Sequence, residues 1–385
     1  MMYNFDEIIP RRGSNSIKWD ATLDDEVLPM WVSDMDFQTV PAVIEAIINR
    51  AKHGIFGYTK VPESYFHAVI NWFQKRYNFS IQREHILCTI GVVPAITVIV
   101  KALTEPDDKV IIQTPVYNCF FSSVRNNGCI LETNELIYKN NSYHIDFEDL
   151  EKKAQDPKTK LLIICSPHNP VGRVWKYDEL QKIGEICMQN NVIVVSDEIH
   201  CDIIYKGHNH VPFGAISHQF FQNSVTCSAP SKTFNIASIQ IANIIAADKE
   251  IRQKIEKTLR ENEVHNINAF AVEALIAAYS EGEKWLEELK EYLYENYITL
   301  LNFFKLNLPH LKVLPLEATY LVWIDCTALK MASKEIAKTL LDKSKLWINE
   351  GTIYGTAGEG FIRINIATQR ETLKRGLNKI WEVFS

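Results

Sequence analysis

Four polar side chains stand where apolar runs of the chain end. Tyr117 lies in TPVYN, Asn169 in SPHNP, Asp197 in VVSDEIH and Lys232 in SAPSK. The separations of 28 residues (Asn169 to Asp197) and 35 residues (Asp197 to Lys232) each correspond to about one strand-helix-strand unit. Because ligands of open α/β sheets gather at the carboxyl ends of the strands, we expect these groups to face one crevice. Lys232 is then a positioned amine rather than a solvated surface cation.

An amine, a carboxylate and an amide at one crevice suit the binding of pyridoxal phosphate. The lysine amine can bond to the aldehyde of this cofactor, and the carboxylate can keep its pyridine nitrogen protonated. The phosphate needs an anion site, and GVVPAITVIV places Gly91, Val92 and Val93 at the start of a predicted helix, where backbone N–H groups are free. Ser228 and Ser231 can add hydroxyl donors. These residues favour a pyridoxal phosphate enzyme.

The elements that must position these groups form an α/β domain. Between residues 85 and 235, short β-branched runs alternate with amphipathic stretches, which predicts parallel strands joined by helices. The helix candidates include PAITVIVKALT from Pro94 and DELQKIGEICMQNN from Asp178, with Asp178 as its cap. The predicted strands are HILCTI, KVIIQTP, LLIICSP, VIVVSDE and SVTCSAP.

After residue 245 the pattern changes to long helices, followed by strands with an antiparallel character, TYLVWIDC and GFIRINIA. This change predicts a second, smaller α+β domain, joined to the first by a continuous helix. We expect an N-terminal arm and part of the small domain over residues 1–45. The large domain is expected over residues 46–280 and the C-terminal small domain over residues 281–385.

Composition excludes several other classes of protein. Apolar residues make up 46% and charged residues 23% of the 385 residues, which is typical of a globular chain. The 41 basic and 47 acidic residues form no basic stripe, so we expect no nucleic-acid partner. No signal peptide or 18-residue apolar run is present, which predicts a cytoplasmic protein without a membrane contact. The eight cysteines are scattered without a C-x-x-C pair, so buried thiols and no metal site are expected.

The chain resembles the fold type I pyridoxal phosphate enzymes of the class I and II aminotransferase superfamily. The resemblance covers nearly the whole chain through FGYT, GVVPA, TPVY, SPHNPVG, SDEIH, SKTFNIA and FIRINIA, in that order. It implies a large domain with a mostly parallel seven-stranded sheet between helices, a smaller α+β domain, and a homodimer with shared active sites. The implied roles are Lys232 for the cofactor aldehyde, Asp197 for the pyridine nitrogen, Asn169 for the phenolic oxygen, Tyr117 for stacking on the ring, Tyr58 for the phosphate of the neighbouring subunit, and Arg363 for the substrate α-carboxylate.

Within that superfamily, LPMWVSDMDF, SPHNPVGRVW, SDEIHCDIIY and APSKTFNIA look more like the branch of cystathionine and cysteine S-conjugate β-lyases. We expect Trp31 and Asp34 of the first stretch to line the substrate entrance. Two positions depart from the common aminotransferase pattern. His200 stands where a tyrosine is usual and is expected near the cofactor. Gln240 stands where an arginine usually meets the phosphate, which leaves that site with less positive charge.

The resemblance implies a β-lyase that cleaves L-cystathionine or a related L-cysteine S-conjugate to a thiol, pyruvate and ammonia, a reaction of cysteine and methionine metabolism. Lys232 and Tyr117 are the expected catalytic residues. An aminotransferase that uses the same residues with a 2-oxo acid acceptor is the alternative. A regulatory protein-binding role added to catalysis is a third possibility.

Overall fold

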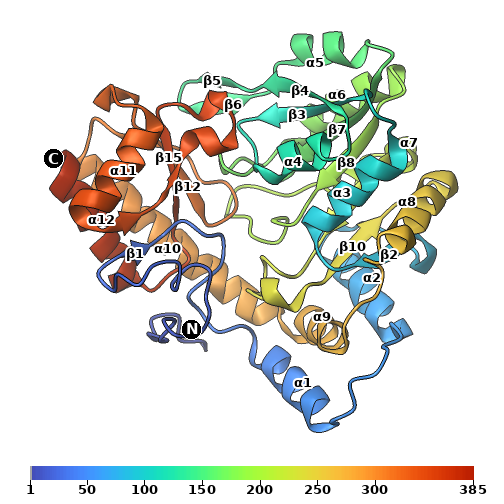
Figure 1. Ribbon diagram of the computed structural model, residues 1–385, viewed down its shortest axis with the longest axis horizontal. Helices are drawn as coiled ribbons and strands as arrows, with labels where there is room; N and C mark the ends of the chain where they lie inside the picture. The colour runs from blue at the N-terminus through green and yellow to red at the C-terminus, as the bar shows by residue number, and fades with distance from the viewer. Residues whose placement is uncertain (1) are drawn as a thin grey trace.

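The computed structural model describes residues 2–385, and its centre is a seven-stranded sheet (Figure 1). The strand order is β2-β10-β9-β8-β7-β3-β4, in which β10 is antiparallel to both of its neighbours and the remaining pairs are parallel. The predicted α/β class with a mostly parallel sheet is confirmed. The strands are β2 (Ile86–Thr89), β3 (Lys109–Thr114), β4 (Ile130–Glu135), β7 (Thr159–Cys165), β8 (Ile193–Asp197), β9 (Ser224–Ser228) and β10 (Ala242–Ile245).

Helices cover both faces of this sheet. Ile112 packs in a buried cluster with side chains of α3, α4 and α8, whereas its neighbour Ile111 packs on the other face in a cluster that includes α5, α6 and α7. Because both faces are buried, these strands are continuous apolar runs instead of alternating ones. The helices are α3 (Val92–Leu103), α4 (Cys119–Arg125), α5 (Phe147–Ala154), α6 (Tyr177–Gln189), α7 (His218–Gln222) and α8 (Lys249–Glu261).

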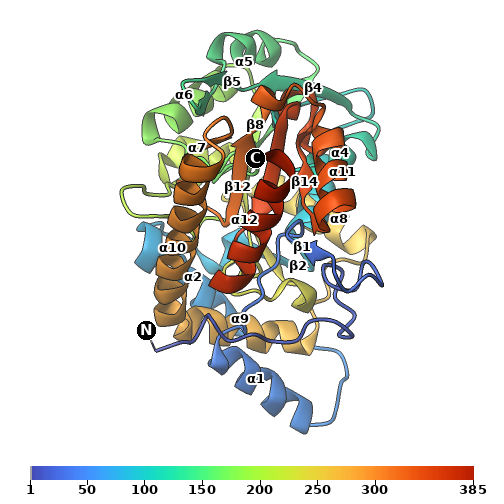
Figure 2. The ribbon, with the colours of Figure 1, turned by 90° about the vertical axis from the view of Figure 1, so that its left-hand side faces the viewer.

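A second, smaller sheet is formed by strands from the C-terminal part of the chain. It is antiparallel and has the order β11-β12-β15-β14. The 25-residue α10 runs alongside this sheet and α12 (Figure 2), and one buried cluster joins Leu293 of α10 to Val322 and Ile364 of the sheet. The domain boundaries at residues 45 and 280 stay a prediction. The elements are α9 (Ala269–Glu281), α10 (Glu283–Asn307), β11 (Lys312–Val313), β12 (Leu321–Asp325), α11 (Ser333–Ser344), β13 (Leu346–Trp347), β14 (Asn349–Glu350), β15 (Phe361–Asn365) and α12 (Arg370–Phe384).

The N-terminal segment crosses the second sheet before it reaches the large sheet. It contains β1 (Leu28–Pro29), which pairs in parallel with β13, and it continues into α1 (Pro41–Lys52) and α2 (Glu63–Tyr77). A separate hairpin is formed by β5 (Ile137–Lys139) and β6 (Ser142–His144). Within the described residues, we find no helix with the length and apolar character needed to cross a membrane.

Two predicted helix starts differ from the structure. Helix α6 begins at Tyr177, and its cap is Lys176, whose backbone N–H donates to Glu179 Oε2 at 2.9 Å. Asp178 was therefore wrongly predicted as the cap. It lies in the first turn, where its charge favours the helix dipole. Helix α3 begins at Val92, two residues before Pro94, because proline is tolerated in a first turn that needs no N–H from it.

Candidate active site

The carboxyl ends of the parallel strands surround a cavity of about 200 Å³. Asp197 ends β8, Lys232 follows β9, and Asn169 follows β7. The cavity therefore brings together groups that lie far apart in the sequence, as expected for the carboxyl edge of such a sheet. The predicted site residues that line it are Gly91, Val92, Val93, Tyr117, Asn169, Asp197, His200, Ser231 and Lys232.

The Lys232 amine donates a hydrogen bond of 2.6 Å to the backbone carbonyl of Ser33. Burial, reinforced by the positive charge of Arg363, lowers the pKa of Lys232 to about 8, while Asp34 and Asp197 oppose that shift. Both burial and a neighbouring cation disfavour the ammonium form. Compared with an ordinary lysine, this amine gives up its proton much closer to neutral pH, as a nucleophile or general base requires.

Asp197 faces the same cavity with only 4% of its surface exposed. Burial raises the pKa of Asp197 to about 7, against the lowering effect of the hydrogen bond of 3.1 Å from the Ile199 N–H and of the Lys232 charge. The cavity thus holds an amine and a carboxyl whose pKa values are both displaced toward neutrality. Such paired displacement is typical of a site that moves protons.

Arg363, on β15, reaches the cavity region from the second sheet. Its guanidinium donates to Asn169 Oδ1 at 3.0 Å, to the Trp31 carbonyl at 2.8 Å and to Ser33 Oγ at 3.2 Å. Its Nε is buried without a partner. Because Asn169 accepts through Oδ1, its amide nitrogen is the group that it can offer to a ligand. The planar guanidinium is suited to a carboxylate that would replace some of these acceptors.

The remaining polar groups of the cavity are held neutral. Burial, with Lys232 and Arg363 nearby, lowers the pKa of His200 to about 3, and His200 Nδ1 is buried without a partner. Burial, with Cys119 nearby, raises the pKa of Tyr117 above its ordinary value, so its hydroxyl keeps its proton. Across residues 2–385, no group of three His, Cys, Asp or Glu side chains is placed to hold a metal ion.

The start of α3 lies at the cavity and offers free backbone N–H groups there. Gly91 is the cap, and the N–H groups of Val92 and Val93 lie in the first turn, where no carbonyl of the same helix can accept from them. Ser231 also lines the cavity, whereas Ser228 is buried beside it with an unpartnered Oγ. Gln240 lines this cavity too, so no arginine side chain is offered at this position, and backbone and hydroxyl groups are the donors available for the predicted phosphate site.

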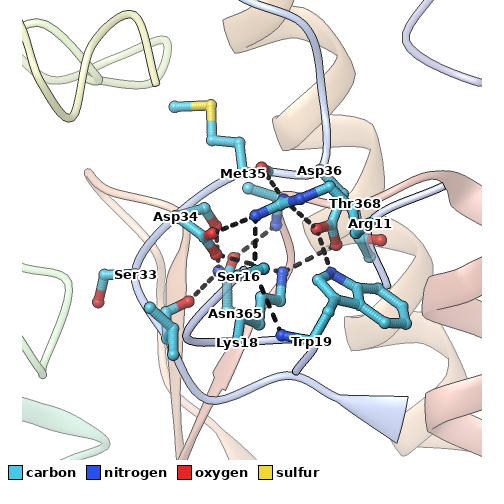
Figure 3. A network of polar contacts seen from close by, with 12 residues as sticks. Arg11, Ser16, Lys18, Trp19, Ser33, Asp34, Met35, Asp36, Asn365 and Thr368 are labelled. Atoms are coloured by element: carbon cyan, nitrogen blue, oxygen red, sulfur yellow. Dashed lines mark hydrogen bonds and ion pairs between the residues drawn. The ribbon is translucent and has the colours of Figure 1, made fainter. Parts of the chain in front are cut away.

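Besides Arg363 and Ser228, three more predicted site residues do not line the cavity. The ring of Trp31 stacks on Trp347, with centroids 5.0 Å apart. Asp34 accepts from Arg11 at 2.8 Å within the ion-pair network of the N-terminal segment, which Figure 3 shows. Tyr58 is fully exposed on the loop between α1 and α2. The predicted roles of these residues stay predictions.

The sequence analysis missed Ser33, whose carbonyl accepts from Lys232. It also missed Tyr320, which donates to the same carbonyl at 3.0 Å, and Asn365, which donates to two carbonyls beside it. Asn365 follows Arg363 by two residues on the same face of β15, which was a usable signal. No pattern in the sequence points to a particular backbone carbonyl.

The sequence matches the family described as Aminotransferase class I and II over residues 25–380, and the chain belongs to this family. It is 44% identical to cystathionine beta-lyase PatB of Bacillus subtilis, with 98% of each chain covered. Among solved structures, a cystalysin from Treponema denticola that contains a pyridoxal 5′-phosphate cofactor matches with a TM-score of 0.97 and 38% identity, covering 100% of this chain and 99% of that one. A pyridoxal-phosphate-bound C-S lyase from Staphylococcus hominis matches with a TM-score of 0.93 and 37% identity, covering 99% of each chain. The predicted family is confirmed.

Proposed function

We propose that this chain is a pyridoxal-phosphate-dependent carbon–sulfur β-lyase that cleaves L-cystathionine or a related L-cysteine S-conjugate to a thiol, pyruvate and ammonia. The observation that carries this proposal is the full-length identity of 44% to a cystathionine beta-lyase. The cavity of this chain holds the Lys232 amine and the Asp197 carboxyl that such a reaction needs. Similarity to C-S lyase structures supports it further and favours the lyase over the aminotransferase alternative.

The cavity fits pyridoxal phosphate by the chemistry of its donors. The amine of Lys232 suits the aldehyde, the carboxyl of Asp197 suits the pyridine nitrogen, and the amide of Asn169 suits the phenolic oxygen. The free N–H groups of Val92 and Val93 suit the phosphate. When bound, the cofactor supplies a conjugated ring that withdraws electrons from the α-carbon of the substrate.

Lys232 has two tasks in this reaction. Its Nζ would hold the aldehyde of the cofactor, and when it is free it would take the proton from the substrate Cα. An amine with a pKa of about 8 can perform the second task because a useful fraction of it is neutral near neutral pH. Tyr117 also lines the cavity, and its hydroxyl keeps its proton.

Arg363 would orient the substrate, and Asp197 would hold the proton of the pyridine nitrogen. The guanidinium exchanges acceptors such as Ser33 Oγ for the α-carboxylate, which fixes the substrate Cα relative to Lys232. Asp197 keeps the pyridine nitrogen protonated, and its burial strengthens that interaction because little water screens it. As the Cβ–S bond breaks, the electron pair of the former Cα–H bond forms a Cα–Cβ double bond and the thiolate leaves. Water then hydrolyses the released enamine to pyruvate and ammonia.

The test combines absorbance with product analysis. The visible absorbance of the bound cofactor should be present in the wild-type protein and should change in Lys232→Ala, and only the wild type should form pyruvate from L-cystathionine without a keto acid. A requirement for 2-oxoglutarate would instead identify an aminotransferase. A protein that gains no cofactor absorbance after incubation with pyridoxal phosphate would overturn the proposal entirely.

We also propose a homodimer in which Tyr58 reaches the phosphate of the neighbouring subunit. The loop between α1 and α2 exposes Ile55, Phe56 and Tyr58 to solvent in the single chain, and an exposed apolar segment of this kind is suited to contact a second copy. Sedimentation should give a dimer, and Tyr58→Phe should weaken cofactor retention without changing the dimer mass. A monomer with full activity would contradict this arrangement.

A further inference from the structure

Residues 31–37, here called the strap, are held in an unusual way. All seven of their backbone carbonyls accept hydrogen bonds from side chains of other parts of the protein, and Figure 3 shows Arg11 and Asn365 bonded to this segment. The strap belongs to no helix or strand, so these bonds replace a sheet ladder in satisfying its backbone. The donors are Arg11, Lys232, Asn235, Tyr320, Asn349, Arg363, Asn365 and Gln369.

The carbonyl of Ser33 has two donors of different kinds. Lys232 Nζ donates at 2.6 Å, and the hydroxyl of Tyr320 donates at 3.0 Å. Tyr320 is buried immediately before β12, and burial together with the charge of Asp34 raises its pKa above the ordinary value. Its hydroxyl therefore keeps its proton and acts as a donor to this carbonyl. The amine and the phenol share one acceptor.

Other groups also set the electrostatic environment of the amine. Arg363 from β15 and Asp34 from the strap face it, as do Asp197 from β8 and Cys119 from the start of α4. His200, which stays neutral, lies on the same side with its ring centroid 6.0 Å from that of Tyr320. Replacing Tyr320 by phenylalanine changes none of these groups and removes one donor from the shared acceptor.

We propose that Tyr320 is a positioning residue whose hydroxyl shares the Ser33 carbonyl with the Lys232 amine whenever this amine is not bonded to the cofactor. By occupying part of the same acceptor, the hydroxyl limits how strongly the carbonyl stabilises the ammonium form, so the amine stays ready to take a proton. The mechanistic meaning of this inference rests on the proposed function, because it assigns the amine its task there. The shared hydrogen bond itself can be tested without any reaction.

The experiment measures the titration of Lys232 directly. The full chain is freed of cofactor, treated with acetic anhydride over a range of pH, and the acetylation rate of Lys232 is read by mass spectrometry. Tyr320→Phe should raise the pH midpoint of the Lys232 titration by about half a pH unit to one unit, which is the effect of a single hydrogen bond. In the holoenzyme, the acid limb of the kcat profile should move in the same direction. An unchanged or lower midpoint would overturn the proposal.

Tyr205→Phe is the matched control. Tyr205 is also buried, and its hydroxyl donates at 2.6 Å to the backbone carbonyl of Thr319, next to Tyr320 in the chain. This variant should lose a comparable amount of stability and leave the midpoint of Lys232 unchanged. An equal shift in both variants would show a general packing effect and overturn the role of Tyr320.

Asn365→Ala supplies a second test of opposite sign, which decides the matter if Tyr320→Phe does not fold. Asn365 Nδ2 donates to the carbonyls of Val32 and Asp34, on either side of Ser33. Without these bonds the Ser33 carbonyl moves away from the amine, so the midpoint of Lys232 should fall. An unchanged midpoint would contradict the proposal. A shift in a protein that binds no pyridoxal phosphate would support the positioning by Tyr320 and refute the proposed function.

Discussion

The cavity is built from two regions that are held in different ways. On one side, Asp197 ends a strand whose register is set by parallel ladders on both sides, opposite Cys165 of β7 and Cys227 of β9. On the other side, the strap has no ladder, and its position depends on single side chains, several of them from segments more than 200 residues away along the chain.

The difference shows that one side of the site is held by a rigid sheet and the other by individual side-chain contacts. The sheet edge derives its position from apolar burial and a cooperative hydrogen-bond network, so one substitution there changes the chemistry more than the geometry. The strap derives its position from individual polar contacts. Four of its carbonyls have a single side-chain donor and are left unsatisfied when that donor is lost; they are those of Val32, Asp34, Asp36 and Phe37. Substitutions in its donors should therefore act through position and stability.

The largest effect is expected at the sheet edge. Asp197→Asn keeps the shape of the side chain and an oxygen for the Ile199 N–H, but it cannot hold the charge that stabilises a protonated pyridine nitrogen. We expect kcat for pyruvate formation to fall by at least about a hundredfold, the scale seen when one preorganised electrostatic group is removed. Full activity of this variant would remove Asp197 from its assigned role.

The same substitution should have the opposite effect on the stability of the cofactor-free protein. The folded pKa of Asp197 is about 7 and lies above its usual value, so wild-type stability is fully present below about pH 4 and is lost as the pH rises through 7. Asp197→Asn does not titrate and should be more stable than wild type by an amount on the order of 3 kcal/mol above pH 7. Urea unfolding at pH 4 and pH 8 measures this. A difference in unfolding free energy between variant and wild type that is the same at both pH values would contradict it.

On the strap, Asn365→Ala should cost about 2 kcal/mol of unfolding free energy, because two buried carbonyls lose their donor. Asn307→Ala is the control, since the Asn307 amide donates to the Phe303 carbonyl at an exposed helix end. We expect the control to change stability by less than about 0.5 kcal/mol. Equal losses in urea unfolding would mean that the strap contacts contribute no more than surface ones.

The smallest effect is expected for Arg363→Lys, which joins the two regions. A lysine keeps the charge but loses the planar fork that contacts Asn169 and the strap together. We expect kcat/KM to fall by about tenfold, mainly through KM, as one bidentate contact becomes a single one. Arg375→Lys on the exposed face of α12 should change neither constant. A kcat-only loss would assign Arg363 to a later step.

Sequence patterns predicted five of the seven strands of the large sheet and missed two. The five strands drawn from apolar β-branched runs correspond to β2, β3, β7, β8 and β9. Strand β4 was missed because the edge strand ILETNE carries polar residues along its length. Strand β10 was also missed, and its antiparallel direction leaves no local signal in the sequence.

By itself, the sequence determined that a lysine, an aspartate and an asparagine end successive buried strands, and this was sufficient to predict the cavity because parallel strands bring their carboxyl ends to one edge. Only the tertiary structure decided which acceptor holds the Lys232 amine. That acceptor is a backbone carbonyl, which every residue possesses, so its identity depends on where Tyr320, Asn365 and Arg363 place the strap and not on any residue type within it.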